Sequence, residues 1–142
     1  MNAGKFFLDT NIFVCTFEER HSAKRDRARQ LVAQALETRL GIISYQVVQE
    51  FLNVTTRKFA KPMSVSDAQL YLARILMPLC EVFPDAALYS QALSISGEMG
   101  IGFYDALIVS SAIGADAVML WSEDLQHGRR IRSLEIRDPF RG

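Results

Sequence analysis

The sequence predicts an α/β fold: a three-layer α/β/α sandwich with a mainly parallel central sheet, formed as a single domain by residues 1–142. Short apolar segments of strand length alternate with longer segments of helical periodicity. The strand segments are apolar throughout, as in strands covered on both faces. The composition is 49% hydrophobic and 23% charged, and no repeats or long linkers interrupt it, which is ordinary for a globular chain with a core.

The first strand is expected at Phe6-Phe7-Leu8, and the polar residues Asp9-Thr10-Asn11 follow it directly. In open α/β sheets, ligand sites lie just beyond the carboxyl ends of strands, so Asp9 stands where a site would form. An aspartate also begins turns and caps helices, so this segment alone is a weak indication. The same order recurs later, where an expected strand over 118–121 runs into Ser122-Glu123-Asp124.

The other elements follow from periodicity and from residues that begin or end helices. Helices are expected over 23–37, over 45–59, from Ser64 or Ser66 through Leu79, after Asp85 with an apolar stripe from Leu88 to Met99, and over 103–115. Strands are expected over 41–44, 81–83 and 134–136. Lys61-Pro62 ends the second of these helices, and Asp85 is the expected cap of the fourth. The helix over 103–115 is apolar almost all round, so we expect it to be buried.

Two further carboxylates lie on expected helices. Glu50 falls about 40° beyond the apolar face of the helix over 45–59, a margin position from which it could reach a neighbouring strand end or simply remain at the boundary. Asp105 is the single charge in the buried helix, so it is expected to be desolvated unless a cation or a hydrogen-bond donor receives it.

Because the carboxyl ends of parallel strands share one edge of a sheet, Asp9, Glu50, Asp105 and Asp124 can converge there. Carboxylates brought together without a cation disfavour one another's ionisation. Oxygen ligands suit Mg²⁺ or Mn²⁺, and such an ion can activate a water that attacks a phosphodiester. Zinc is not expected, because the only two histidines have no Cys, Asp or Glu at a zinc-motif spacing.

The ordered segments Leu8-Asp9-Thr10-Asn11, Val48-Gln49-Glu50-Phe51, Tyr104-Asp105-Ala106-Leu107-Ile108 and Ser122-Glu123-Asp124-Leu125 resemble the motifs of the PIN domain, in its branch of VapC-like toxins of bacterial toxin–antitoxin pairs. The resemblance covers essentially the whole chain. It implies an endoribonuclease that depends on Mg²⁺ or Mn²⁺, is usually a homodimer, and is held inactive by a small antitoxin protein.

Carried over to this chain, the resemblance implies that Asp9, Asp105 and Asp124 are metal ligands and that Glu50 holds a ligand water or helps to activate the attacking one. It also implies that three polar residues steady this acidic group by hydrogen bonding: Thr10, Asn11 and Ser122. The family more often has a threonine where Ser122 stands. The adjacent Glu123 is an alternative to Asp124 as the metal ligand. The number of metal ions is left open.

RNA binding requires cations near its phosphates, although Lys plus Arg (16) balances Asp plus Glu (16) over the whole chain. The first candidates are the arginines that follow the fourth segment, Arg129, Arg130 and Arg132; the cluster over 24–29 comes second, and the cations over 57–61 come third. The alternatives are a PIN-type nuclease of RNA processing, an inactive RNA- or partner-binding module on the same fold, and a phosphatase with Asp9 as covalent nucleophile. Asn11 disfavours the phosphatase, which would want an acid or base at that position.

Cys15 and Cys80 have no metal-ligand spacing and are too few for a disulfide framework, so both are expected to be reduced thiols. No stretch has the apolar length of a signal peptide or of a membrane span. We therefore expect a cytoplasmic protein with no membrane partner.

Overall fold

A six-stranded sheet lies at the centre of the computed structural model, which describes residues 4–141. Its strands are β1 (Phe6–Leu8), β2 (Gly41–Ser44), β3 (Cys80–Val82), β4 (Met119–Trp121), β5 (Arg130–Ile131) and β6 (Leu134–Arg137), in the order β3-β2-β1-β4-β6-β5. Every neighbouring pair is parallel except β5 and β6, which are antiparallel. The predicted mainly parallel sheet is confirmed.

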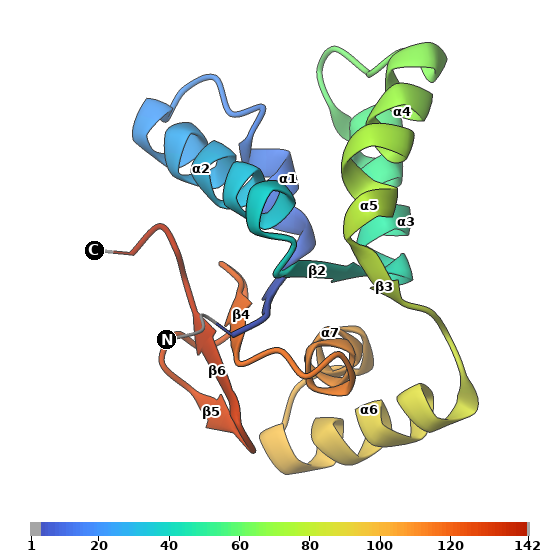
Figure 1. The fold of residues 1–142 in the computed structure, drawn as a ribbon, viewed down its shortest axis with the longest axis vertical. Helices are drawn as coiled ribbons and strands as arrows, with labels where there is room; N and C mark the ends of the chain where they lie inside the picture. Colours follow the sequence, from blue (N-terminus) through green and yellow to red (C-terminus); the bar gives the residue numbers. More distant parts are fainter. Residues whose placement is uncertain (1–3, 142) are drawn as a thin grey trace.

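Helices cover both faces of this sheet. They are α1 (Thr10–Cys15), α2 (Ser22–Thr38), α3 (Tyr45–Asn53), α4 (Val65–Tyr71), α5 (Met77–Leu79), α6 (Ala86–Met99) and α7 (Phe103–Gly114), with two π-helical turns, η1 (Val54–Lys58) and η2 (Leu72–Leu76). Figure 1 shows α6 and α7 on one side of the sheet and α2 to α5 on the other. This arrangement confirms the three-layer α/β/α architecture.

Local sequence signals explain where several elements begin and end. The side chain of Asp85 accepts a hydrogen bond from the Leu88 backbone N–H at 2.7 Å and so caps α6, as expected. Gly100 ends that helix with a φ of 67°, a left-handed conformation that glycine adopts without strain. Gly41 permits close packing of β2 on α2, because a Cβ at this position would lie 2.1 Å from the Cβ of Ala35.

Several details differ from the sequence-based expectations, and the helix α1 was not expected at all. The helix expected over 45–59 is α3 followed by the π turn η1, and the helix expected up to Leu79 contains the π turn η2. In η1, the hydroxyls of Thr55 and Thr56 donate to carbonyls four residues back, which is a known way to distort a helix. β3 begins one residue earlier than expected, and the two-residue strand β5 was not predicted because so short a segment has no periodicity.

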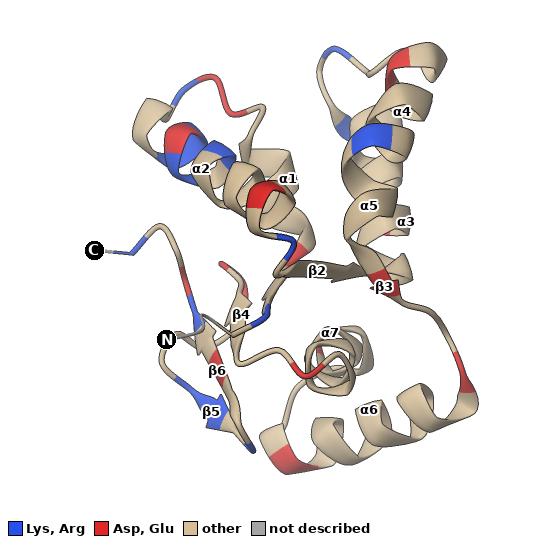
Figure 2. Ribbon diagram, viewed as in Figure 1, with Lys and Arg blue, Asp and Glu red and all other residues tan. Residues whose placement is uncertain are grey.

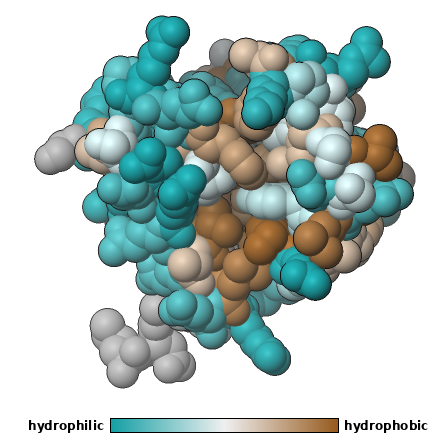
Figure 3. Space-filling model, turned by 90° about the horizontal axis from the view of Figure 1, so that it is seen from above, coloured by the Kyte–Doolittle hydropathy of each residue, from teal (hydrophilic) through white to brown (hydrophobic). Residues whose placement is uncertain are grey.

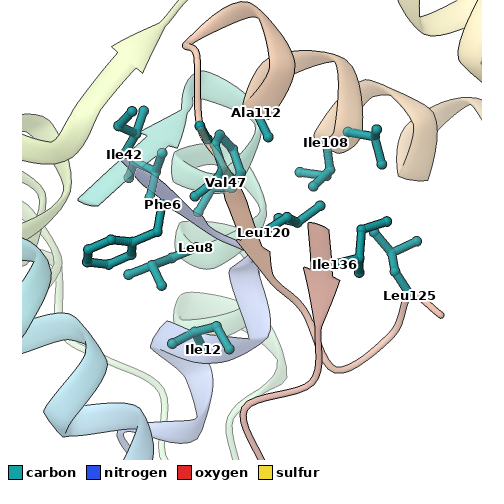
Figure 4. Close-up of a cluster of buried hydrophobic side chains, with 14 of the residues drawn as sticks. Phe6, Leu8, Ile12, Ile42, Val47, Ile108, Ala112, Leu120, Leu125 and Ile136 are labelled. Carbon is teal, nitrogen blue, oxygen red and sulfur yellow. The ribbon is translucent and has the colours of Figure 1, made fainter. Parts of the chain in front are cut away.

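The core lies on both faces of the sheet. Figure 4 shows strand residues such as Leu8, Leu120 and Ile136 together with Val47 of α3 and Ile108 of α7. Each of these five side chains is 3% exposed or less. α7 is buried over 106–112, as its composition predicts, so the core fixes the position from which its first turn emerges.

No single helix within residues 4–141 has the length and apolar character needed to cross a membrane. α6 and α7 meet those criteria only as a pair, and the two helices are bent by 114° at the break between them.

Candidate active site

Four carboxylates from separate segments line one hollow of about 350 Å³: Asp9, Glu50, Asp105 and Asp124. β1 and β4 are parallel neighbours in register, so the residues that follow these strands emerge at the same edge of the sheet. This brings Asp9 and Asp124 together. Glu50 comes from α3 and Asp105 from the first turn of α7. The structure therefore gathers the four acidic residues that the sequence singled out.

Asp9 is the most buried of the four, with 8% of its surface exposed. Its Oδ2 accepts a hydrogen bond from the Ser122 hydroxyl at 2.7 Å, and its Oδ1 accepts one from the Thr10 backbone N–H at 2.7 Å. The pKa of Asp9 is nevertheless raised to about 6, mainly by burial and also by the carboxylates of Asp124 and Glu50, while the two hydrogen bonds oppose the rise. The ionised form of Asp9 is thus costly until a positive charge compensates it.

The other two polar residues of the first motif also contact carboxylates. The Thr10 hydroxyl donates to Oε1 of Glu50 at 2.7 Å, and the Asn11 amide donates to Oδ2 of Asp124 at 2.7 Å. Burial and the nearby carboxylates of Glu123 and Asp105 raise the pKa of Asp124. The turn that follows β1 therefore contacts three of the four carboxylates, those of Asp9, Glu50 and Asp124.

The expectation that Asp105 is desolvated is wrong. Its side chain is exposed, and burial of α7 begins only at Ala106. The first turn of α7 projects beyond the packed part of the helix, where the helix dipole favours an acid. Within residues 4–141, Asp105 forms no side-chain hydrogen bond or ion pair, so its position depends on the backbone of α7.

The structure also separates Glu123 from Asp124. The Lys24 ammonium on α2 forms an ion pair with Glu123, and this hydrogen bond raises the pKa of Lys24. Glu123 lines a different hollow, between α2 and the segment that follows β6, whereas Asp124 lines the acidic hollow. Asp124 is therefore the member of the acidic group.

The donor set suits a hydrated magnesium or manganese ion. Within residues 4–141, no three carboxylate, imidazole or thiol groups already form a complete ligand set. Mg²⁺ does not require one, because it usually retains several waters and binds one or two carboxylates together with substrate phosphates. The raised pKa of the buried Asp9, surrounded by oxygen donors, is the property that such a cation would relieve.

The candidate RNA-binding cations differ in their positions. Arg129 lines a hollow of about 250 Å³ that shares Asp105 and Asp124 with the acidic hollow. Arg130 is paired with Glu135 at 3.0 Å, and Arg132 is paired with Glu98 at 3.1 Å. Neither of these two arginines lines the acidic hollow.

Two residues of the hollow were missed or underrated from the sequence. Lys58, at the end of η1, lines the hollow directly, although its group ranked third among the cation candidates. Gln46 was not singled out at all, and its amide lies 3.5 Å from Oε2 of Glu50. The sequence feature that could have identified Gln46 is its spacing of four residues from Glu50, which places both side chains on one face of a helix.

The PIN domain profile matches residues 6–131. A search of curated protein sequences finds no match. The chain belongs to the PIN domain family.

Solved structures of low sequence identity share the fold. They include a toxin–antitoxin complex from Klebsiella pneumoniae, 15% identical, covering 96% of this chain and 98% of that one with a TM-score of 0.68. The sarcin-ricin loop cleaving toxin VapC20 from Mycobacterium tuberculosis is 18% identical, with coverages of 84% and 92% and a TM-score of 0.60. DNA-bound VapBC from Salmonella typhimurium is 23% identical, with coverages of 96% and 99% and a TM-score of 0.60.

Proposed function

We propose that this PIN-domain protein is a metal-dependent endoribonuclease and the toxin of a toxin–antitoxin pair. The observation that carries the proposal is the hollow in which Asp9, Glu50, Asp105 and Asp124 meet. The burial of Asp9, with its pKa raised to about 6, supports a site built for a cation. The proposed substrate and the two free cysteines suit a cytoplasmic location.

Asp9, Asp105 and Asp124 would hold Mg²⁺, or Mn²⁺ in its place. When bound, such an ion lowers the pKa of water and stabilises charge on the phosphate. Glu50 would orient the attacking water and accept its proton at Oε2, because Oε1 accepts the Thr10 hydroxyl at 2.7 Å whereas the Gln46 amide lies 3.5 Å from Oε2. Lys58 and Arg129 are the best-placed cations for the RNA phosphates, and Arg130 and Arg132 would extend the contact beyond the hollow.

Purified protein should cut a structured RNA pool with Mg²⁺ or Mn²⁺ and should lose this activity in EDTA. Activity should return when the metal is added back in excess, because the oxygen donors do not otherwise supply an activated water. Cleavage is followed by gel electrophoresis of end-labelled RNA. RNA binding without cleavage under every metal condition would favour the inactive module instead. A phospho-aspartate trapped at Asp9 would favour the phosphatase.

A nuclease of RNA processing would share this chemistry, so the toxin role depends on a partner. An apolar groove of about 670 Å³ runs between Phe17 and α4, with Phe59, Leu70 and Tyr71 in its lining. Figure 3 shows hydrophobic side chains gathered in a central hollow on the face seen from above. We propose that the apolar face of a small antitoxin occupies this groove, because an exposed apolar surface of this kind fits a protein partner. The toxin–antitoxin complex among the structural neighbours supports such a partner.

Leu70→Asp should weaken inhibition by the cognate antitoxin at least tenfold, because it places a charge in the apolar groove. Gln69→Asp is the matched control, since Gln69 is exposed on the same helix and does not line the groove. Inhibition is titrated in the RNA cleavage assay. Equal inhibition of both variants would place the antitoxin elsewhere.

We also propose a homodimer that uses the outer face of α6. This helix carries the exposed side chains of Tyr89 and Leu93, with 63% of Leu93 exposed. Figure 2 shows that charged residues are confined to its ends. Light scattering should give about twice the 16.0 kDa chain mass, and Leu93→Glu should return it to the monomer value. A monomeric wild-type protein would overturn this assignment.

A further inference from the structure

The Gln46 side chain is a buried amide between two helices of the site. It is 4% exposed, and its Nε2 lies 3.1 Å from the Tyr104 carbonyl oxygen and 3.5 Å from Oε2 of Glu50. Both neighbours are acceptors, so the orientation of the amide is fixed: the reversed amide would direct its oxygen at two other oxygens. Its two N–H groups therefore point at α7 and at Glu50.

Gln46 connects the acidic group to the first turn of α7. Ser122 and Thr10 donate to Asp9, Thr10 donates to Glu50, and Gln46 continues this series to the backbone of Tyr104. The next residue is Asp105, which has no side-chain bond of its own within residues 4–141. The hydrogen bond from Gln46 to Tyr104 therefore joins the turn that carries Asp105 to the helix that carries Glu50.

The amide is not the side chain that would make the protein most stable at this position. Its Oε1 is buried and has no hydrogen-bond partner within residues 4–141. An unpaired buried acceptor is costly, and an unbranched apolar side chain of similar length would remove it. The stability of the fold alone therefore does not account for a glutamine here.

We propose that Gln46 is a positioning residue that fastens the first turn of α7 to α3 and so fixes Asp105 relative to Glu50. This inference rests on the proposed function for its catalytic consequence, whereas the fastening of the turn is a property of the metal-free protein. Gln46 acts through its neighbours. It supplies neither charge nor a proton to the reaction.

The test compares Gln46→Met with Gln49→Met. Methionine keeps the length of the side chain and removes both N–H groups, and Gln49 is exposed on the same helix. Hydrogen exchange of metal-free protein should be about fivefold faster at the Ala106 amide, whose hydrogen bond to the Gly102 carbonyl closes the first turn of α7. This acceleration is expected in Gln46→Met only, from the loss of a buried neutral hydrogen bond. Its melting temperature should equal or exceed that of the wild type, because the unpaired acceptor is gone.

Mn²⁺ affinity, measured by calorimetry, should fall about tenfold in Gln46→Met, and kcat should fall by tenfold or more with KM for RNA little changed. Gln49→Met should match the wild type in all measurements. Unchanged hydrogen exchange at the first turn of α7 in Gln46→Met would overturn the inference. A lower melting temperature of Gln46→Met would also overturn it, if general destabilisation explained the faster exchange, the weaker Mn²⁺ binding and the lower kcat. If the wild type neither binds Mn²⁺ nor cuts RNA, the proposed function fails, and the exchange and melting results still decide the role of Gln46.

Discussion

Asp105→Asn should lower metal-dependent RNA cleavage by more than about 100-fold while leaving the fold intact. Asp105 is exposed and forms no side-chain hydrogen bond or ion pair within residues 4–141, so the substitution removes only its interaction with the dipole of α7, about 0.3–1 kcal/mol. Asparagine keeps the shape of the side chain and removes its negative charge. The loss should therefore arise at the metal and not from unfolding.

The measurement is kcat/KM on one RNA substrate at several Mn²⁺ concentrations, together with the melting temperature. Asp26→Asn is the control, because Asp26 is exposed on α2 and does not line the acidic hollow. Cleavage at the wild-type rate by Asp105→Asn would remove Asp105 from the site. A parallel loss in Asp26→Asn would point to a general effect of charge.

Asp9→Asn should abolish cleavage and also stabilise the metal-free protein, fully so above about pH 6. The folded pKa of Asp9 is raised from 3.8 to about 6, mainly by burial, so ionisation of this carboxyl destabilises the fold. Asparagine removes the charge. Its oxygen can still accept from the Thr10 backbone N–H, and its amide can donate to a rotated Ser122 hydroxyl.

The sign of this effect depends on pH. Below about pH 3.8 the carboxyl is protonated in both the folded and unfolded states, so wild type and Asp9→Asn should differ little. As the pH rises from 3.8 to about 6, the free energy of unfolding of the wild type falls relative to that of the variant. Above pH 6 the difference between the two free energies becomes constant. A shift of about two pKa units corresponds to a gain of up to about 3 kcal/mol.

Denaturant unfolding of both proteins from pH 4 to pH 8, in EDTA, measures this difference. Added Mg²⁺ should then stabilise the wild type more than the variant, because the cation compensates the buried charge. A variant less stable than the wild type at pH 8 would show that its hydrogen bonds, and not the cost of the charge, dominate at this position.

The sheet and the acidic segments were predictable because they follow local rules. Strands such as Phe6–Leu8 are apolar because both faces are covered, and residues that follow parallel strands share an edge. Periodicity assigns a face to each helical residue, but it does not show where a helix emerges from the core, which is why the exposure of Asp105 was misjudged. The ion pair of Arg132 with Glu98 depends on the unpredicted position of β5 beside the end of α6.

The π turn η1 makes the position of Lys58 depend on the number of residues before it. A π turn accommodates one more residue than a regular α-helical turn, and each α-helical residue advances by about 100°. Deleting one residue between Val54 and Lys58 would let α3 continue as a regular helix and would rotate the lysine away from the acidic hollow. The position of the Lys58 cation beside the carboxylates therefore depends on the extra residue in the helix as much as on the lysine itself. A sequence alignment that leaves out this extra residue would not place Lys58 at the hollow.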